Sequence, residues 1–580
     1  MYYVPVQRCQ VIGGLPHHSP TGTTWEAPVN PDQASKTLLD PAGLSGVSRR
    51  KFLKFSGTLS AAAVITGALA ACGGPSSTNS NDGAAAGGTV PDTIEATLAF
   101  TLSSGLDPMN ASSAVGTAAN QHLFEGLVDL DPITRQPYPA LAKALPEPGA
   151  DGLTWTATLR DGAMFSDGTP VTAEDVAWSF TRALDPANKA LMAAFLPFID
   201  SVTAKDAKTV EFTLKSPFAL FPQRIAVIKV VPKKLTGDAA AAKAFDTKPV
   251  GTGPWKLDSA DATTGLRFSV NDKYNGPRKA AAKKMVWNTT TEGATRIADI
   301  QGGRVQAVEA VPYINVAQLE GKVDVEARQA FNQLFLLFNC SAKPFDDKRV
   351  RQALHYALDK DAIVTTALQG YGTPAKSYLD PENKDFQEAS TVYGYDPEKA
   401  KALLAEAGVK DLTFELVTTN TQFIVDIAPL MVDQWKKIGV NASLNTAPSA
   451  SVYAPAPDGL VSKDSFRVLA ASGDPTVFGP DADLLLRWYF AGDTWPKGRA
   501  RWTGAAPTQI AQLLDQAAAE QDTAKQKDLW KQVLDLVADE AAIYTVLHTK
   551  IVTAWDSKKL DGFKPAATTG LYFLDAKRTA

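Results

Sequence analysis

The spacing of apolar residues along the chain predicts a mixture of short strands and helices. Between Leu153 and Leu159 every second residue is apolar, which is the period of a half-buried strand. Asp-Gly dipeptides at 161–162 and 167–168 are turn signals that end the extended segments. Helical spacing begins at Thr172, a good capping residue, and two acidic residues in the following turn suit the positive end of a helix.

Two further segments carry strong helix signals. In YDPEKAKALLAEAG, Asp396 is expected to cap the helix, and the proline after it occupies a position where its missing N–H costs nothing. An apolar stripe follows at helical spacing, and Gly408 suits the left-handed residue that ends a helix. A second helix is predicted to begin at Asp346 or Asp347, and a third at Asp359.

Ahead of these periodic segments lies a pattern typical of an export signal. Arg49 and Arg50 precede an uncharged run, residues 55–71, that is rich in Ala, Gly, Ser and Thr and too weakly apolar to span a membrane. The run ends in Leu-Ala-Ala-Cys, so Cys72 is predicted to be the lipid-bearing first residue of the mature protein. The alternative is a chance arginine pair before an alanine-rich helix, which does not explain the order of these features.

The same pattern divides the N-terminal part of the chain. We predict that residues 1–71 are a long n-region and a twin-arginine lipoprotein signal peptide, and that residues 72–90 form a flexible tether. Because residues 1–47 show no periodic pattern, either the n-region is unusually long or the true start codon lies downstream of Met1. The lipid would hold the mature protein on the extracytoplasmic face of the cell membrane.

The composition of the chain mainly shows which partners and structural features are not expected. Without residues 1–71 the chain carries 52 basic and 59 acidic residues, a net charge of −7, which argues against nucleic acid as a partner. Three cysteines, Cys9, Cys72 and Cys340, are too few for a disulfide framework. A chain of this length with 45% hydrophobic residues is expected to form two or three domains.

Common catalytic and metal-binding motifs are missing from the sequence. No Gly-x-Ser-x-Gly elbow appears, and the only Ser-x-x-Lys, at 48–51, falls inside the predicted signal. The glycine-rich stretch at 251–254 lacks the Gly-Lys-Ser/Thr of a phosphate loop. Metal-ligand spacing is absent among the five histidines, which are His17, His18, His122, His355 and His548. We therefore predict a protein that is not an enzyme and that uses no metal or cofactor.

Several longer motifs occur in a recognisable order. They are LDPMN, HLFEGLVDLDP, PALAKAL, LTWTATLRDGAMFSDGTPVTAEDVAWSF, KPVGTGPWKL, KPFDDKRVRQALHYALDKDAIV and YGYDPEKAKALLAEAG. Taken together, from about residue 95 to about residue 575, the chain resembles the large extracellular solute-binding proteins of ABC importers. This class, family 5, includes oligopeptide-, dipeptide- and nickel-binding members.

The resemblance implies an α/β fold of the periplasmic-binding-protein type. Two lobes with mixed sheets are expected to enclose the ligand in a cleft between them, with an extra subdomain inserted in the first lobe. The segments 91–130, 245–335 and 545–580 are predicted to form the first lobe, residues 131–244 the insertion, and residues 336–544 the second lobe. Hinge closure around the ligand would distinguish the loaded form from the open form.

The resemblance also points to a ligand-binding segment. Peptide-binding members use a Gly-Trp-x-x-Asp stretch whose backbone pairs with the peptide and whose aspartate holds its α-ammonium. Here the matching positions are Ala470, Ala471, Ser472, Gly473 and Asp474. With Ala471 in place of the tryptophan, the site has room for a bulkier ligand, which weakens the case for a peptide. Asp474 is equally well explained as a turn residue before a proline.

Three other residues are candidates for the cleft by resemblance. Ser103 precedes Leu-Asp-Pro on a first-lobe strand that contacts ligand backbone in relatives. Phe338 and Asn339 stand where the second lobe begins and are expected to line the cleft or the hinge. For Asn339, a structural role in bonding the backbone at a strand end is the favoured alternative.

These expectations define a transport receptor. It would capture a solute, most readily an oligopeptide or dipeptide, and deliver it as a monomer to an ABC permease that works with a separate ATPase. The same scaffold also serves non-peptide solutes such as metal chelates, opines and oligosaccharides. A surface hydrolase and a receptor that signals rather than transports are the remaining alternatives.

Overall fold

A computed structural model describes residues 92–218 and 220–579. The predicted signal peptide, with Arg49 and Arg50, lies outside the described residues, as do Cys72 and the tether up to residue 90. No helix within the described ranges combines the length and the apolar composition that a membrane span needs.

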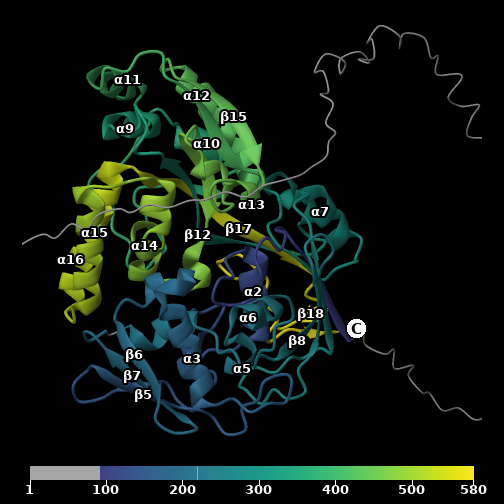
Figure 1. Cartoon of the computed structure of the whole chain (residues 1–580). Helices are drawn as coiled ribbons and strands as arrows, with labels where there is room; N and C mark the ends of the chain where they lie inside the picture. The colour runs from purple at the N-terminus through teal and green to yellow at the C-terminus, as the bar shows by residue number, and fades with distance from the viewer. Residues whose placement is uncertain (1–91, 219, 580) are drawn as a thin grey trace, which may run out of the picture. The chain divides into compact units, whose positions relative to one another are not determined.

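One large mixed sheet runs through the described residues, in the order β15-β14-β16-β12-β17-β11-β1-β10-β9-β8, with β13 paired to β17 off this path. Its two central strands, β12 (Asp324–Phe338) and β17 (Ile543–Trp555), are antiparallel and pair along almost their whole length. Figure 1 shows them side by side, with β15 and α12 toward one end and β8 toward the other. These two strands are therefore the connection between the predicted lobes.

The remaining strands of the large sheet divide between the two predicted lobes. On the first-lobe side they are β1 (Thr93–Leu98), β8 (Trp255–Asp261), β9 (Gly265–Val270), β10 (Lys284–Thr289) and β11 (Ala307–Val308). On the second-lobe side they are β13 (Gly372–Pro374), β14 (Thr413–Thr419), β15 (Asn441–Ala447) and β16 (Val468–Gly473). Parallel pairs join β1 to β10 and β11, and β14 to β15 and β16, so the expectation of mixed sheets is confirmed.

The predicted insertion contains a separate four-stranded sheet in the order β4-β5-β7-β6. Its strands are β4 (Glu147–Pro148), β5 (Thr154–Thr158), β6 (Ile199–Ala204) and β7 (Thr209–Leu214). The predicted alternation is confirmed in β5, where Trp155 and Ala157 are buried between outward-facing threonines. The predicted helix start is also confirmed, because Thr172 and Asp175 form a reciprocal capping box at the head of α3 (Ala173–Leu184).

Helices cover the sheets in both predicted lobes. Besides α3, those of the first lobe and the insertion are α2 (Ala114–Leu123), α4 (Phe221–Arg224), α5 (Lys233–Thr236), α6 (Ala239–Thr247), α7 (Gly293–Gln301) and α8 (Val316–Leu319). Those of the second lobe are α9 (Lys348–Tyr356), α10 (Lys360–Ala367), α11 (Pro397–Glu406), α12 (Gln422–Lys436), α13 (Ser449–Val452), α14 (Ala482–Phe490), α15 (Ala505–Ala519) and α16 (Thr523–Glu540). Short pairs β2 (Val128–Leu130) with β3 (Pro137–Pro139), and β18 (Leu560–Asp561) with β19 (Lys577–Arg578), complete the fold.

The helix caps predicted from sequence are present. Asp396 accepts a hydrogen bond from Lys399 N at 2.9 Å at the head of α11, and Gly408 takes the left-handed conformation after its end, with φ of 69°. Of the two candidate caps for α9, it is Asp347 that bonds the first turn, through Arg349 N at 2.9 Å. Asp359 caps α10 through Ala362 N at 2.9 Å.

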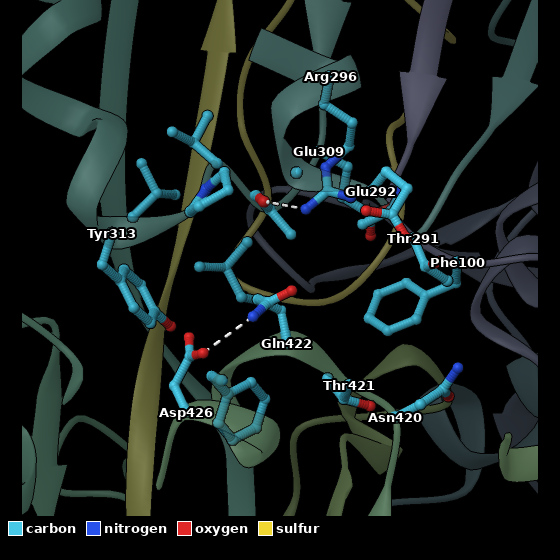
Figure 2. A pocket seen from close by; sticks show the side chains of 18 of the residues that line it. Phe100, Thr291, Glu292, Arg296, Glu309, Tyr313, Asn420, Thr421, Gln422 and Asp426 are labelled. Carbon is cyan, nitrogen blue, oxygen red and sulfur yellow. Dashed lines mark hydrogen bonds between the residues drawn. The ribbon is translucent and has the colours of Figure 1, made fainter. Parts of the chain in front are cut away.

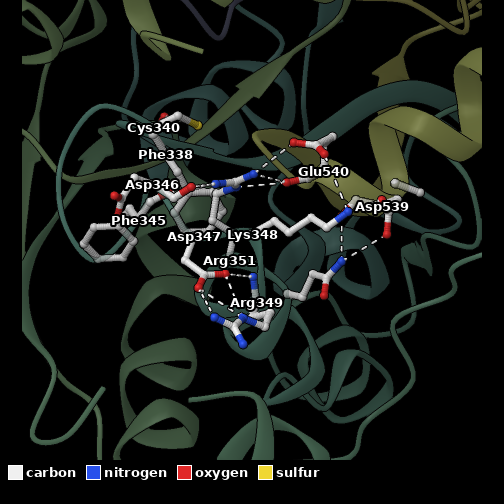
Figure 3. A network of polar contacts seen from close by, with 12 residues as sticks. Phe338, Cys340, Phe345, Asp346, Asp347, Lys348, Arg349, Arg351, Asp539 and Glu540 are labelled. Atoms are coloured by element: carbon white, nitrogen blue, oxygen red, sulfur yellow. Dashed lines mark hydrogen bonds and ion pairs between the residues drawn. The ribbon is translucent and has the colours of Figure 1, made fainter. Parts of the chain in front are cut away.

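A polar network ties α9 to the end of α16, immediately before β17 begins (Figure 3). The buried Arg351 guanidinium donates to Glu540 O at 2.7 and 2.9 Å and to Phe345 O at 2.8 Å. Lys348 pairs with Asp539 at 2.5 Å. Cys340 lies beside this network as a free, half-buried cysteine, and burial raises the pKa of its thiol to about 11.

The insertion and the second lobe share one hydrophobic core, whereas the first lobe has cores of its own. A buried ionic group crosses the shared core: Arg224 of α4 bonds Asp483 at 2.8 Å and contacts Asp481, and Arg487 also bonds Asp483, at 2.9 Å. The two aspartates neutralise the two buried arginines, and Phe195 O accepts a further hydrogen bond from Arg224 at 3.1 Å. The insertion is therefore packed firmly against the second lobe as well as being continuous with the first.

His355 in α9 is a buried polar residue of a different kind. Its ring is fully buried, stacks on Tyr393 with centroids 4.9 Å apart, and neither nitrogen has a hydrogen-bond partner among the described residues. Burial, reinforced by the charge of Lys360, holds the pKa of His355 well below its ordinary value. The folded protein therefore keeps this ring neutral.

We predict that His355→Leu makes the protein more resistant to acid. Below pH of about 6.5 the unfolded chain protonates His355 and the folded protein does not, so wild type loses up to about 1.4 kcal/mol per pH unit from this residue. Leucine removes that loss. Urea unfolding at pH 7 and pH 5 should show the difference in free energy of unfolding, variant minus wild type, rising as the pH falls. A difference that stays constant would contradict the prediction.

Candidate binding cleft

A cavity of about 680 Å³ lies between residues of the two predicted lobes. Its first-lobe wall comes from segments 99–103, 291–296 and 309–315, with Thr569 and part of β17. Its second-lobe wall comes mainly from segments 420–430 and 448–450. This volume falls within the range of about 300 to 1,000 Å³ that small-molecule sites occupy.

The sheet topology explains why these segments meet. β1, β10 and β11 are parallel neighbours, so the loops that leave their carboxyl ends emerge at one edge of the sheet. β14 and β15 are likewise parallel, and the loops after them form the opposite wall. Between the walls the β12–β17 ladder is irregular from Gln329 to Gln333, and there Asn332 and Lys550 line the cavity.

Two buried charged residues, Arg296 and Glu309, order the first-lobe wall. Glu309 accepts hydrogen bonds from Ala99 N at 3.0 Å and Gly570 N at 2.6 Å. Arg296 donates to Thr290 O and Ala310 O, each at 2.9 Å, and its Nε has no partner among the described residues. Burial raises the pKa of Glu309 and lowers that of Arg296, while each charge opposes the shift of the other.

Two carboxylates face the cavity from opposite walls. Glu292 stands at the head of α7 on the first-lobe wall, and Asp426 lies on α12 of the second lobe (Figure 2). Gln422 Nε2 donates to Asp426 at 2.8 Å, and partial burial raises the pKa of Asp426. Within the described ranges, neither carboxylate has an ion-pair partner.

The rest of the lining mixes apolar and aromatic side chains with many polar ones. Ile314 is 74% exposed beside the cavity, which is unusual for a large apolar side chain. Tyr313 donates through its hydroxyl to Lys550 O at 2.9 Å and stacks on Tyr371, and Figure 2 shows that hydroxyl directed toward Asp426. The cavity therefore offers a ligand both apolar surface and many polar groups.

Of the residues singled out from the sequence, Ser103 is the one that lines this cavity. Ala470 and Ala471 are fully buried in β16, opposite Leu336 and Phe335 of β12. The other members of the segment, Ser472 and Gly473, are half-buried at the end of that strand. Gly473 has a steric role there, because a Cβ would lie 1.7 Å from the Tyr489 hydroxyl.

The pair at the end of β12 lies inside the second lobe, away from the cavity lining. Phe338 is fully buried, and its ring stacks on Phe345 with centroids 5.9 Å apart. Asn339 is 1% exposed, donates through Nδ2 to Phe466 O at 3.0 Å and accepts from Ser341. These contacts match the structural role that was the favoured alternative for Asn339.

Asp474 follows the carboxyl end of β16, and its carboxylate is fully engaged within the protein. It accepts from Thr476 N at 3.1 Å and from the Thr476 hydroxyl, which makes it the cap of a short turn. It also accepts from Thr568 Oγ1 at 2.9 Å and Thr569 N at 3.1 Å, in the segment predicted to belong to the first lobe. Burial raises the pKa of Asp474, and these donors oppose the shift.

The residues missed by sequence reasoning are Glu292, Arg296, Glu309, Tyr313 and Asp426. A usable signal existed for the first two, because TTEGATR follows directly on the strand-like run MVWNT. The others needed the strand order, which brings loops more than one hundred residues apart to the same edge. Among the described residues, no three His, Cys, Asp or Glu side chains gather closely enough to hold a metal ion.

Comparisons with proteins of known structure define the class. The dipeptide binding protein from Pseudoalteromonas sp. SM9913, in complex with Met-Leu, superimposes with a TM-score of 0.75 at 22% identity, covering 84% of this chain and 100% of its own. The binding protein AgaA from A. tumefaciens R10, in complex with agropinic acid, gives a TM-score of 0.74 at 25% identity, covering 84% and 99%. The expected two-lobed periplasmic-binding-protein fold is confirmed.

Sequence comparison gives the family within that class. The model of bacterial extracellular solute-binding proteins, family 5, matches residues 136–499. The glutathione-binding protein GsiB of Escherichia coli O1:K1 is 31% identical over 481 residues, which cover 81% of this chain and 92% of GsiB. The chain belongs to family 5 of the solute-binding proteins, as its ordered motifs indicated, and such proteins are extracytoplasmic components of ABC transporters.

We predict that Asp474→Ala lowers the stability of the ligand-free protein. The mutation leaves buried donors without their acceptor, which should cost about 1.5 to 3 kcal/mol of the free energy of unfolding. Asp464→Ala is the control, because that carboxylate is exposed and should change the value by less than about 0.5 kcal/mol. Chemical unfolding of the two variants measures both. Unchanged stability with weakened ligand binding would instead favour the ammonium anchor.

Proposed function

We propose that this solute-binding protein captures a small peptide in the cleft and delivers it to an ABC permease. The observation that supports this best is the pair of carboxylates, Glu292 and Asp426, that face the cavity from opposite walls without ion-pair partners among the described residues. A ligand ammonium placed between them would gain charge-assisted hydrogen bonds from both lobes at once. Such a ligand would favour the closed form over the open one, because only closure brings both acids to it.

Other features of the cavity suit the rest of a peptide. Phe100, Phe423 and Ile314 offer apolar surface for side chains. Lys550 is the cationic group of the lining that we propose for a ligand carboxylate, because Arg296 is buried. Ser103 is proposed to contact the ligand backbone from the first lobe.

The strand β16 is proposed as a second place for backbone pairing. β14 pairs with β16 only as far as Ala470, whereas β12 pairs with it up to Gly473. The last part of β16 therefore has a strand neighbour on only one side in these ladders, at Ala471, Ser472 and Gly473. An extended peptide is the kind of ligand that can pair with such a free strand edge.

For Asp474 we propose the turn role with a link between lobes, in preference to the ammonium anchor. An ionised carboxylate has about four acceptor sites, and four protein donors already engage this one. A ligand ammonium would have to displace one of them. The acids Glu292 and Asp426 require no such displacement.

A non-peptide solute, such as a metal chelate, an opine or an oligosaccharide, is the alternative ligand class. Relatives on this fold were crystallised with agropinic acid and with Ni(L-His), so the scaffold does not by itself select a peptide. No histidine or cysteine is found among the residues that line the cavity, which disfavours an uncomplexed soft metal. We also propose that the protein acts as a monomer, without catalysis and with a separate ATPase behind its permease.

The ligand prediction is tested by two neutralising substitutions. Native mass spectrometry of the purified protein identifies a retained solute, and calorimetric titration then measures it beside glutathione, Met-Leu and agropinic acid. Glu292→Gln and Asp426→Asn should each weaken binding of a cationic ligand by about tenfold or more.

Glu320→Gln is the matched control, because Glu320 is an exposed acid of the first-lobe region outside the lining. Its affinity should equal that of wild type. Retention of full affinity by both cleft variants would overturn the proposed ammonium site. Binding of none of these solute classes, together with turnover of one of them, would overturn the transport function.

We further propose that Cys72 carries the lipid anchor and that Arg49 and Arg50 direct export by the twin-arginine route. All three lie outside the described residues, and the support is the sequence order of arginine pair, apolar run and cysteine. Cys72→Ser should release the protein from the membrane, since two acyl chains on that residue would supply the stable anchoring.

Cell fractionation distinguishes the two parts of this prediction. Replacing both arginines with lysine should leave precursor inside the cell, whereas Cys72→Ser should alter only attachment. Normal membrane attachment of Cys72→Ser would contradict the lipoprotein assignment. Normal surface levels of the double arginine variant would contradict the twin-arginine route.

A further inference from the structure

The second lobe contains another cavity, of about 470 Å³. It lies between the start of α10, the strand β13 and the loop that leads to α11, and His548 of β17 also reaches it. Leu358, Leu379, Phe386 and Tyr393 supply much of an apolar wall. It shares no lining residue with the cleft, and its volume is again typical of a small-molecule site.

One cation, Lys360, lines this cavity from within the protein. Lys360 is 5% exposed, and its Nζ makes no hydrogen bond or ion pair with any part of the chain that the structure describes. Its nearest aromatic contact is the Tyr393 ring, with Nζ 5.8 Å from the centroid. The other lysine of the lining, Lys376, is exposed and is 3.8 Å from Glu388.

The position of Lys360 is unfavourable for a charge by itself. It is the first residue of α10, where the helix dipole is positive and a cation is repelled. It is also desolvated, which lowers the pKa of Lys360 to about 7, against the small opposing effect of Asp361. An anion beside Nζ would reverse both effects, because it would neutralise the charge and face the helix N-terminus.

We propose that this cavity is a second ligand site, which binds a small organic carboxylate whose charge pairs with Lys360 and whose apolar body lies against Tyr393 and Phe386. The apolar wall excludes a bare inorganic ion as the best-fitting occupant, since it would leave that surface without a partner. His548 remains neutral there, because burial lowers its pKa to about 4, so it adds no second charge. This inference does not depend on the solute that the cleft captures.

The test compares acids with their neutral amides on the full chain. Benzoate and phenylacetate are titrated by calorimetry or saturation-transfer NMR against benzamide and phenylacetamide. At least one acid should bind with one site per chain and about tenfold more tightly than its amide, because only the acid pairs with Lys360. Equal binding of acid and amide, or no binding of either acid at about 10 mM, would overturn the proposal.

Substitutions locate the site. Lys360→Met keeps the length of the side chain without its charge, so it should fold with an unchanged or higher melting temperature and lose acid binding by about tenfold or more. Lys376→Met is the matched control in the same lining and should change affinity by less than about threefold, as exposed ion pairs contribute little. Loss of acid binding in Lys550→Met but not in Lys360→Met would place the ligand in the cleft and overturn the assignment.

Discussion

The antiparallel pairing of β12 with β17 is the constraint on which the rest of the structure depends. These strands pair from Asp324 with Trp555 to Leu337 with Ile543, and no other pair in the large sheet is as long. At one end β17 pairs with β11 of the first lobe, and at the other β12 pairs with β16 of the second. The ladder breaks between Gln329 and Gln333, and β-sheet irregularities of this kind bend strands locally. The cleft lies at that break.

Charged residues have two different roles at the cleft. Arg296 and Glu309 are buried, and their hydrogen bonds go mainly to backbone groups, so they hold loops in place. Glu292 and Asp426 face the cavity without ionic partners among the described residues, so their charge is available to a ligand. A binding site needs both kinds, because unpaired charges recognise a ligand only when the loops that carry them are ordered. The same contrast separates Lys360, whose Nζ has no partner among the described residues, from Arg224 of the insertion and Arg351 of the second lobe, which bond to groups of the protein.

Local sequence signals predicted the elements whose formation is decided within a few residues. The strand β5, the capping box of α3 and the caps Asp347, Asp359 and Asp396 were all readable, because alternation and capping act over one or two turns. The resemblance of ordered motifs supplied the two-lobed fold. The resemblance predicted few of the residues that line the cleft. Ser103 does line the cavity, but the segment from Ala470 to Asp474 is outside the lining, in β16 and the turn that follows.

The amino-acid sequence by itself therefore determined the family and the positions of many helices and strands. Tertiary structure alone decided which side chains share the cleft, because that depends on strand order rather than on spacing along the chain. β1 lies between β10 and β11, so Phe100, Glu292 and Glu309 meet although nearly two hundred residues separate the first two. The burial of single charged residues could not be predicted from the sequence either. In the sequence Asp474, Asp426 and Lys360 are all simply charged residues, and only the packing of the fold determines the partners of each and its exposure to a ligand.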